Sequence, residues 1–155
     1  MIQAVIFDLY ETLITEWEKG SKKASYSVEL LGIEEALYRH EWHARVNDRM
    51  DGTFADHPSV LKEILTENGL PIDEEVIQVI HEQRVYVKSV AFEHIDDSII
   101  KMLENLKAKN IKIGLISNCT SEEIEGWYTS LLPPFFDDIV FSYEVKSVSQ
   151  IQAST

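Results

Sequence analysis

The stretch IQAVIFDLYETL, residues 2–13, decides the fold. Its first part, residues 2–7, is a short apolar run rich in β-branched and aromatic side chains, which predicts a strand buried on both faces. Asp8 follows directly at the carboxyl end of this strand. An aspartate at a strand end is, taken alone, more often a turn or cap residue than a nucleophile, so the rest of the chain decides its role.

A long polar segment with helical periodicity separates this strand from the next one. Between about residues 16 and 90, apolar residues recur with the spacing of amphipathic helices, and turn-forming residues divide the segment into about four helices. We therefore predict two domains: a core of residues 1–14 and 92–155, and an inserted helical cap of residues 15–91.

Two further strands are predicted after the cap. The sequence DDSIIKMLENLKAKN, residues 96–110, has a helical apolar face, and IKIGLIS, residues 111–117, is a second buried strand. Thr120 and Glu123 have the spacing of a capping box that opens another helix. The stretch DIVFSYEV, residues 138–145, is the third predicted strand.

Strands that alternate with helices predict an α/β fold, a Rossmann-like parallel sheet in three layers that carries the helical cap. Ligands of such sheets bind at the carboxyl ends of the strands. Asp8 and the pair Ser117-Asn118 both follow strands in this way, although about a hundred residues separate them. We expect them to meet at one edge of the sheet.

These motifs resemble those of the haloacid dehalogenase superfamily. Asp8, followed four residues later by Thr12, resembles the first motif of that family, and LISNCT, residues 115–120, resembles the second. The stretch LPPFFDDIVFSYEV, residues 132–145, resembles the lead-in to the third motif. The resemblance covers residues 2–145 and implies a capped, Rossmann-like hydrolase fold.

The resemblance implies an aspartate-based mechanism. Asp8 would be the nucleophile that forms a covalent intermediate, with Thr12 in the same catalytic motif. Ser117, with Asn118 beside it, would bind the oxygens of the transferring group. In a phosphatase, Asp8 and the backbone carbonyl of Tyr10 would also hold Mg²⁺. We therefore expect a hydrolase closest to a phosphatase of small phosphorylated metabolites.

Tyr10 departs from the family's phosphatase pattern. Phosphatases usually carry at this position a second aspartate, which protonates the leaving group and later activates water. A phenol, with an ordinary pKa of about 10, is a poor replacement. Tyrosine does occur here in the 2-haloacid dehalogenase branch, where halide leaves without a proton and no metal is used. A 2-haloacid dehalogenase-like hydrolase is therefore the first alternative.

The end of the chain, KSVSQIQAST in residues 146–155, departs further. Family members continue into a catalytic lysine, expected here near Ser149, and then into an acidic metal-binding motif on a fourth strand. We therefore expect an incomplete sheet without strands four and five, and turnover far below that of a complete relative. A catalytically inactive relative that serves as a fold remnant or binding module is the second alternative.

The same incompleteness predicts a surface for self-association. Without strands four and five, residues 2–7 would form an edge of the sheet, and this strand has neither charge nor proline to protect it. We expect the chain to self-associate through this edge, to exchange elements with a second copy, or to be poorly soluble.

Composition excludes several classes of partner. The 155-residue chain has 27 acidic and 14 basic residues, a net charge of −13, which repels nucleic acid and anionic membrane surfaces. Its single cysteine, Cys119, rules out an internal disulfide and argues against a structural zinc site. Asp8 interrupts the N-terminal apolar run too early for a signal peptide or a membrane span. We expect a cytoplasmic protein that binds a small phosphate ester.

The first predicted cap helices carry further polar groups. His40 and His43 lie three residues apart, but a solvated surface is a better interpretation than a metal site, because the spacing is not HExxH. Arg39, Arg45 and Arg49 could reach an anionic substrate, though charges on a helical face usually contact water.

Overall fold

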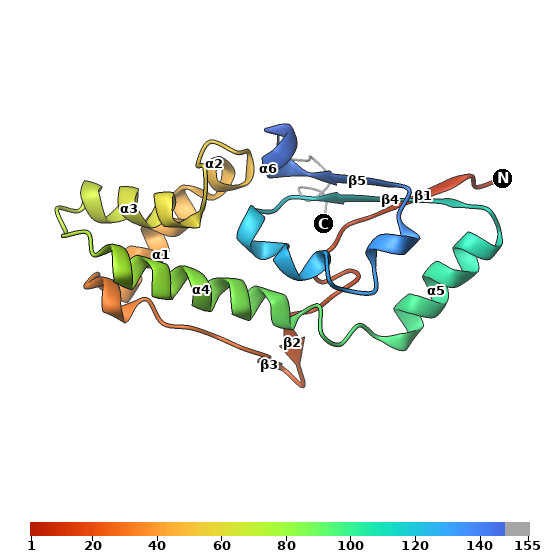
Figure 1. The fold of residues 1–155 in the computed structure, drawn as a ribbon, viewed down its shortest axis with the longest axis horizontal. Helices are drawn as coiled ribbons and strands as arrows, with labels where there is room; N and C mark the ends of the chain where they lie inside the picture. The colour runs from red at the N-terminus through yellow and green to blue at the C-terminus, as the bar shows by residue number, and fades with distance from the viewer. Residues whose placement is uncertain (148–155) are drawn as a thin grey trace.

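The protein has a parallel sheet of three strands in its computed structural model, which describes residues 1–147. The strands are β1 (Ala4–Phe7), β4 (Lys112–Ser117) and β5 (Asp138–Phe141), in the order β1-β4-β5 (Figure 1). Both neighbouring pairs run parallel, and β4 is the central strand. The predicted α/β fold is confirmed.

The predicted helical segment lies between β1 and β4. It begins with an unpredicted hairpin, β2 (Trp17–Glu18) and β3 (Ser21–Lys22), and a 3₁₀ turn, η1 (Glu29–Leu31). Four helices follow, as predicted, and a fifth leads into the sheet: α1 (Glu35–Ala44), α2 (Val46–Met50), α3 (His57–Glu67), α4 (Glu74–Val90) and α5 (Asp97–Ala108). Aspartates cap three of these helices, because the side chains of Asp56, Asp73 and Asp96 accept hydrogen bonds from backbone N–H groups of the first turn.

The chain after β4 differs from its prediction. The capping box of Thr120 and Glu123 is present, but it opens a series of short turns rather than one α-helix: η2 (Ser121–Glu123), η3 (Glu125–Trp127) and η4 (Pro133–Phe135). Ile124, between the first two turns, leaves the helical region with φ −119° and ψ 14°.

The third strand is shorter than predicted. It ends at Phe141, and the last four residues of the predicted strand form one helical turn, α6 (Ser142–Val145). The Ser142 hydroxyl accepts a hydrogen bond from the Cys119 N–H at 3.0 Å and donates one to the Cys119 carbonyl at 3.2 Å. These side-chain bonds replace the backbone bonds that a longer β5 would make with the segment after β4.

The prediction that residues 2–7 are buried on both faces is wrong. Burial alternates along β1: Val5 and Phe7 are half-buried, whereas Ala4 is exposed and Ile6 is 61% exposed. The physical reason is that alternate side chains of a strand point to opposite faces of the sheet. The helical elements cover only one face here.

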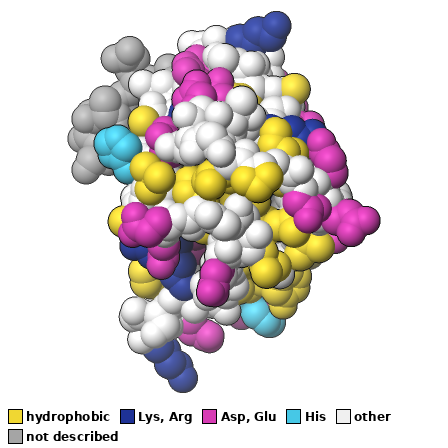
Figure 2. Space-filling view, turned by 90° about the vertical axis from the view of Figure 1, so that its left-hand side faces the viewer, with side chains coloured by type: hydrophobic (Ala, Val, Ile, Leu, Met, Phe, Trp, Pro, Cys, Tyr) yellow, Lys and Arg dark blue, Asp and Glu magenta, His cyan; other side chains and the backbone are white. Residues whose placement is uncertain are grey.

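Figure 1 shows α5 and the 3₁₀ turns after β4 on one side of the sheet. A second helical layer on the opposite side does not occur within residues 1–147. In the same part of the chain, no helix is long and apolar enough to cross a membrane. The end of the molecule formed by the cap carries acidic side chains interspersed with hydrophobic ones (Figure 2).

Buried hydrophobic side chains form two clusters. The first lies between the sheet, α5 and the 3₁₀ turns and includes Leu103, Leu115 and Trp127. The second, with Leu61 and Ile80, lies among the helices that precede α5. We use the name cap for the predicted domain of residues 15–91, and its boundaries stay a prediction.

Candidate active site

The carboxyl ends of β1 and β4 bring the predicted nucleophile and the second motif together. Phe7 pairs with Leu115, and Asp8 therefore follows β1 at the level of Ile116. Ser117, the last residue of β4, is one position further along. Strand spacings place the Cα atoms of Asp8 and Ser117 about 6 Å apart. Asp8, Ser117 and Asn118 thus lie at one edge of the sheet, while their catalytic roles stay predictions.

A tight turn fixes the chain after Asp8. The carbonyl of Leu9, a fully buried residue, accepts hydrogen bonds from the N–H groups of Leu13 at 2.9 Å and Ile14 at 3.2 Å. The Thr12 N–H contacts the same carbonyl at 3.3 Å, and its side chain is exposed. The turn holds Asp8 at the sheet edge. The catalytic role of Thr12 stays a prediction.

Glu11 occupies the strained position of this turn. Its φ of 58° lies in the left-handed region, which favours glycine. The carboxylate compensates by accepting hydrogen bonds from the Thr15 hydroxyl at 2.7 Å and from the Glu16 N–H at 3.0 Å. A side chain is therefore accommodated at a backbone conformation that favours glycine.

The Tyr10 side chain connects three segments of the chain. Its hydroxyl donates a hydrogen bond to the Glu123 carbonyl and lies 3.4 Å from the Lys88 carbonyl. Its ring packs edge-on against Phe92. Burial raises the pKa of the Tyr10 phenol above its ordinary value. Tyr10 is thus a structural link between the nucleophile turn, α4 and η2.

The second motif is buried. Ser117 is 1% exposed and Asn118 is 7% exposed, and Cys119 is equally enclosed. Burial raises the pKa of the Cys119 thiol, which disfavours the reactive thiolate form. This environment argues against a nucleophilic role for Cys119.

A network of buried charges joins the cap to the core, and the sequence analysis did not predict it. We define the junction network as Glu16, Arg84, Lys88, Glu122 and Glu123. Arg84 contacts Glu122 at 3.0 Å and Glu123 at 3.3 Å, and Lys88 contacts Glu16 at 2.6 Å and Glu123 at 3.5 Å. Although burial opposes it, the hydrogen bond from Lys88 lowers the pKa of Glu16. The only sequence signal was the spacing of Arg84 and Lys88, four residues apart on one helix face.

The three cap arginines have different environments. Arg39 is exposed and pairs with Glu35, as expected for a charge on a helical surface. Arg45 is 8% exposed and Arg49 is 7% exposed, so the expectation that they face water is wrong. Arg45 is buried because three carboxylates from α1 and α3 surround it: Glu41, Glu63 and Glu67. Arg49 stacks on the Trp42 ring, with 3.9 Å between its guanidinium carbon and the ring centroid.

The described residues provide a minimal set of oxygen ligands for Mg²⁺. Residues 1–147 contain no group of three His, Cys, Asp or Glu side chains placed to hold a metal ion. Asp8 and the Tyr10 carbonyl remain the predicted ligands. Magnesium often binds through one or two protein carboxylates, with waters and substrate phosphate as its other ligands, so this set fits the ion.

Comparison with known proteins places this geometry in a family. The family model for haloacid dehalogenase-like hydrolases matches residues 2–151. The chain belongs to this family. A comparison with curated protein sequences found no match.

Solved structures of haloacid dehalogenase-family proteins share the fold. An HAD family enzyme from Bacteroides thetaiotaomicron, bt-2542, is 16% identical with a TM-score of 0.61, over 99% of this chain and 77% of that one. The same enzyme in complex with magnesium and inorganic phosphate is 15% identical with a TM-score of 0.61, over 97% and 73%. The L-2-haloacid dehalogenase RSc1362 is 19% identical with a TM-score of 0.50, over 99% and 69%.

This haloacid dehalogenase-like chain has no lysine where the family's catalytic lysine is expected. That position, near Ser149, lies outside the described residues. Lys146 is exposed and ends α6 in a left-handed conformation with φ 56°. It follows β5 by one helical turn rather than extending the strand.

Proposed function

We propose that this haloacid dehalogenase-like hydrolase is a cytoplasmic phosphatase of small phosphate esters, with Asp8 as its nucleophile. The observation that carries the proposal is the β1–β4 register, which places Asp8 beside Ser117 and Asn118. Family membership supports hydrolysis. The complex of bt-2542 with magnesium and inorganic phosphate supports phosphate as the group that this fold accommodates.

The reaction has two displacements at phosphorus. An Asp8 carboxylate oxygen attacks phosphorus, the bond to the ester oxygen breaks, and the leaving alkoxide or aryloxide takes the electron pair and then a proton from water. Water next attacks the aspartyl phosphate at phosphorus, which releases inorganic phosphate and restores the carboxylate. The Ser117 hydroxyl and the Asn118 amide donate hydrogen bonds to the phosphoryl oxygens in both steps.

The Asp8 carboxylate and the Tyr10 carbonyl would hold Mg²⁺ in this site. The ion, when bound, neutralises the repulsion between a carboxylate and a phosphate dianion. Asp8 is the one acidic side chain in this predicted set, and residues 1–147 contain no group of three His, Cys, Asp or Glu side chains placed to hold a metal ion. The proposal therefore predicts weak magnesium binding that strengthens when phosphate is present.

Tyr10 limits the esters that react well. Because its hydroxyl is bonded to the Glu123 carbonyl, Tyr10 does not supply a proton to the leaving group. Esters whose leaving group is already a weak base need no such proton. We therefore expect aryl phosphates to react faster than alkyl phosphates.

The direct test is magnesium-dependent release of p-nitrophenol from p-nitrophenyl phosphate. Asp8→Asn should abolish it. The matched control is Asp138→Asn, since Asp138 is exposed at the opposite, amino-terminal edge of the sheet, and this variant should keep the wild-type rate. A second measurement detects phosphoryl binding even if turnover is too slow to follow. Beryllium fluoride, a phosphoryl mimic that binds carboxylates, should raise the Tm of wild type in the presence of Mg²⁺ but not that of Asp8→Asn.

Absence of both responses in wild type would overturn the phosphatase proposal. It would leave the catalytically inactive alternative. Equal rates in wild type and Asp8→Asn would also contradict the proposal, because they would assign the activity to another residue or to a contaminant.

A 2-haloacid dehalogenase is the second candidate, and the Tyr10 hydrogen bond favours it. Halide leaves with its electron pair and needs no proton, so a bonded phenol at this position is no handicap. Asp8 would attack carbon, and water would then hydrolyse the ester. Chloride release from 2-chloropropionate in the presence of EDTA, lost in Asp8→Asn, would replace the phosphatase with this activity.

A further inference from the structure

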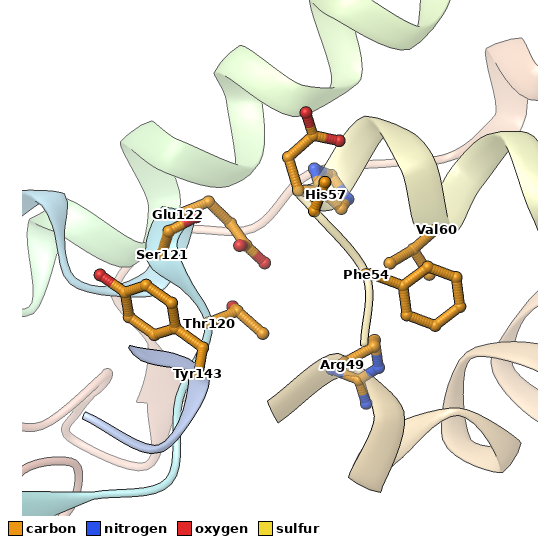
Figure 3. A pocket seen from close by; sticks show the side chains of 10 residues that line it. Arg49, Phe54, His57, Val60, Thr120, Ser121, Glu122 and Tyr143 are labelled. Carbon is orange, nitrogen blue, oxygen red and sulfur yellow. The ribbon is translucent and has the colours of Figure 1, made fainter. Parts of the chain in front are cut away.

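A small cavity lies where the cap meets the segment after β4 (Figure 3). Its volume is about 20 Å³, which leaves room for a small polar group. Arg49, Phe54 and His57 line it from the cap, and Thr120 and Glu122 line it from the core. Figure 3 shows these two sets of side chains facing each other across the cavity.

Arg49 brings a buried positive charge to the cavity wall. Its Nε donates to the Trp42 carbonyl at 3.2 Å, and one face of its guanidinium stacks on the Trp42 ring. Among residues 1–147 Arg49 forms no ion pair, and the Arg84 guanidinium lies over the same ring, 4.8 Å from its centroid. Burial, and then the charge of Arg84, lower the pKa of Arg49, while the more weakly acting charges of Glu123 and Glu122 oppose this shift. A buried cation without a carboxylate partner favours an anionic ligand.

His57 adds a second polar group without a partner. The side chain is 2% exposed, and its Nε2 atom is buried with no hydrogen-bond partner among the described residues. Its Nδ1 atom lies 3.2 Å from Nδ1 of His81. Burial lowers the pKa of His57 to about 2, so the ring is neutral. If His81 donates in this contact, His57 carries its proton on Nε2 and offers it to the cavity.

The two carboxylates in the wall already have partners. Glu122 accepts a hydrogen bond from Arg84 Nε at 3.0 Å, and Asp56 accepts one from the Ser59 N–H at 2.9 Å. Neither contacts Arg49 as an ion pair. The N-terminus of α3, which begins at His57, also favours negative charge near the cavity. Among the polar groups of the cavity wall that lack a partner, hydrogen-bond donors therefore outnumber acceptors.

We propose that this cavity binds a carboxylate group, held by the Arg49 guanidinium and the His57 Nε2–H, and that the substrate attacked by Asp8 carries it. Thr120 follows Ser117 by three residues, so their Cα atoms are at most about 11 Å apart. A small phosphorylated carboxylic acid would then place its phosphoryl group at Asp8 and its carboxylate in this cavity. This substrate assignment rests on the proposed function, whereas carboxylate binding does not.

Acetate and its neutral isostere acetamide are the first probes. Acetate should raise the Tm of wild type in a saturable manner, and acetamide should not. The response should persist in Asp8→Asn, and in the control Arg39→Met, which removes an exposed arginine of the cap. In Arg49→Met the acetate affinity should fall by about tenfold or more, the usual effect of removing a charge-assisted hydrogen bond.

His57→Phe gives an independent test, and it replaces Arg49→Met if that variant does not fold. It removes the second donor and should also weaken the acetate response. No difference between acetate and acetamide in wild type would overturn the proposal. An acetate response unchanged in both Arg49→Met and His57→Phe would overturn it as well.

Kinetic measurements show whether the carboxylate bound in the cavity belongs to the substrate or to another ligand. Phosphate esters of short hydroxy acids should have higher kcat/KM than esters of the matching hydroxy amides, and Arg49→Met should remove this preference. Acetate binding without any such preference would support the cavity but overturn the substrate assignment. If no ester turned over at all, the proposed function would fail, and the acetate result would still decide the carboxylate site.

Discussion

Arg84 of the cap helix α4 donates through Nε to Glu122 of the core at 3.0 Å, and the two side chains are only 8% and 3% exposed. Arg84 also contacts Glu123, whose carbonyl accepts the hydrogen bond from Tyr10. This pair therefore connects the cap to the turn that follows the second motif. It joins α4 to the segment that follows Ser117 and Asn118.

Removal of Arg84 should strongly destabilise the protein. In Arg84→Met two carboxylates stay buried without the positive charge of Arg84. Loss of one partner of a buried ion pair costs about 3–5 kcal/mol of stability. Arg39→Met is the matched control, because it removes a single exposed pair that contributes less than about 1 kcal/mol. Urea denaturation measures both free energies of unfolding. Similar losses in the two variants would show that the junction pair is not a major stabilising contact.

His57 should make the protein less stable in acid. Burial, with Arg84 nearby, lowers its pKa from 6.5 to about 2. As pH falls below the ordinary value, the unfolded chain binds a proton at His57 and the folded chain does not, so stability is lost by up to about 1.4 kcal/mol per pH unit. In His57→Phe the dependence of the unfolding free energy on pH should be flatter between about pH 6 and 4. The exposed His94, changed to Phe, is the control, and equal slopes in the two variants would contradict the prediction.

Gly52 should tolerate no side chain. Its φ is +83°, and a Cβ atom there would lie 2.6 Å from the Tyr143 carbonyl oxygen of α6. Gly20 has the same φ but has no atom within 4 Å of a Cβ. Gly20→Ala should therefore cost only the left-handed strain of about 1–2 kcal/mol, and Gly52→Ala should cost more. Thermal unfolding of the two variants checks the difference, and equal losses would count against the close approach.

The β1 edge should mediate self-association. Among the described residues, β1 pairs on one side only, and Ile2 and Ile6 are 68% and 61% exposed. Ile6→Lys places a charge on this strand, which disfavours edge-to-edge pairing. Ile72→Lys, at an exposed position before α4, is the control. Sedimentation velocity should show a smaller associated fraction only in Ile6→Lys, and a wild type that stays monomeric at all concentrations would refute the prediction.

The sequence alone predicted the three strands and, for β1 and β4, the place where each ends. The apolar runs before Asp8 and Ser117 are continuous, and parallel strands place their carboxyl ends at one edge, so the meeting of these two residues followed from topology. The helices of the cap also followed from periodicity, because side chains such as Leu61 and Ile64 recur at the helical spacing.

Buried charges were not predictable in this way. Sequence patterns assign charged residues to solvent, and Arg84 finds its partner Glu122 only 38 residues later in the chain. Arg49 is buried by its stacking on the Trp42 ring. The two residues lie in different helices, α2 and α1, and the periodicity within one helix does not specify such a contact. The early end of β5 likewise depends on hydrogen bonds between Ser142 and Cys119, which are distant in sequence.

The most direct test of the central claim, that Asp8 is a phosphoryl acceptor, is to trap the intermediate. The protein is mixed with p-nitrophenyl phosphate and Mg²⁺, quenched in acid and mapped by mass spectrometry. The account predicts one phosphoryl group on the peptide that contains Asp8, released by hydroxylamine as an acyl phosphate is, and absent in Asp8→Asn. A phosphoryl group on any other residue, or phosphate release that persists in Asp8→Asn, would contradict it.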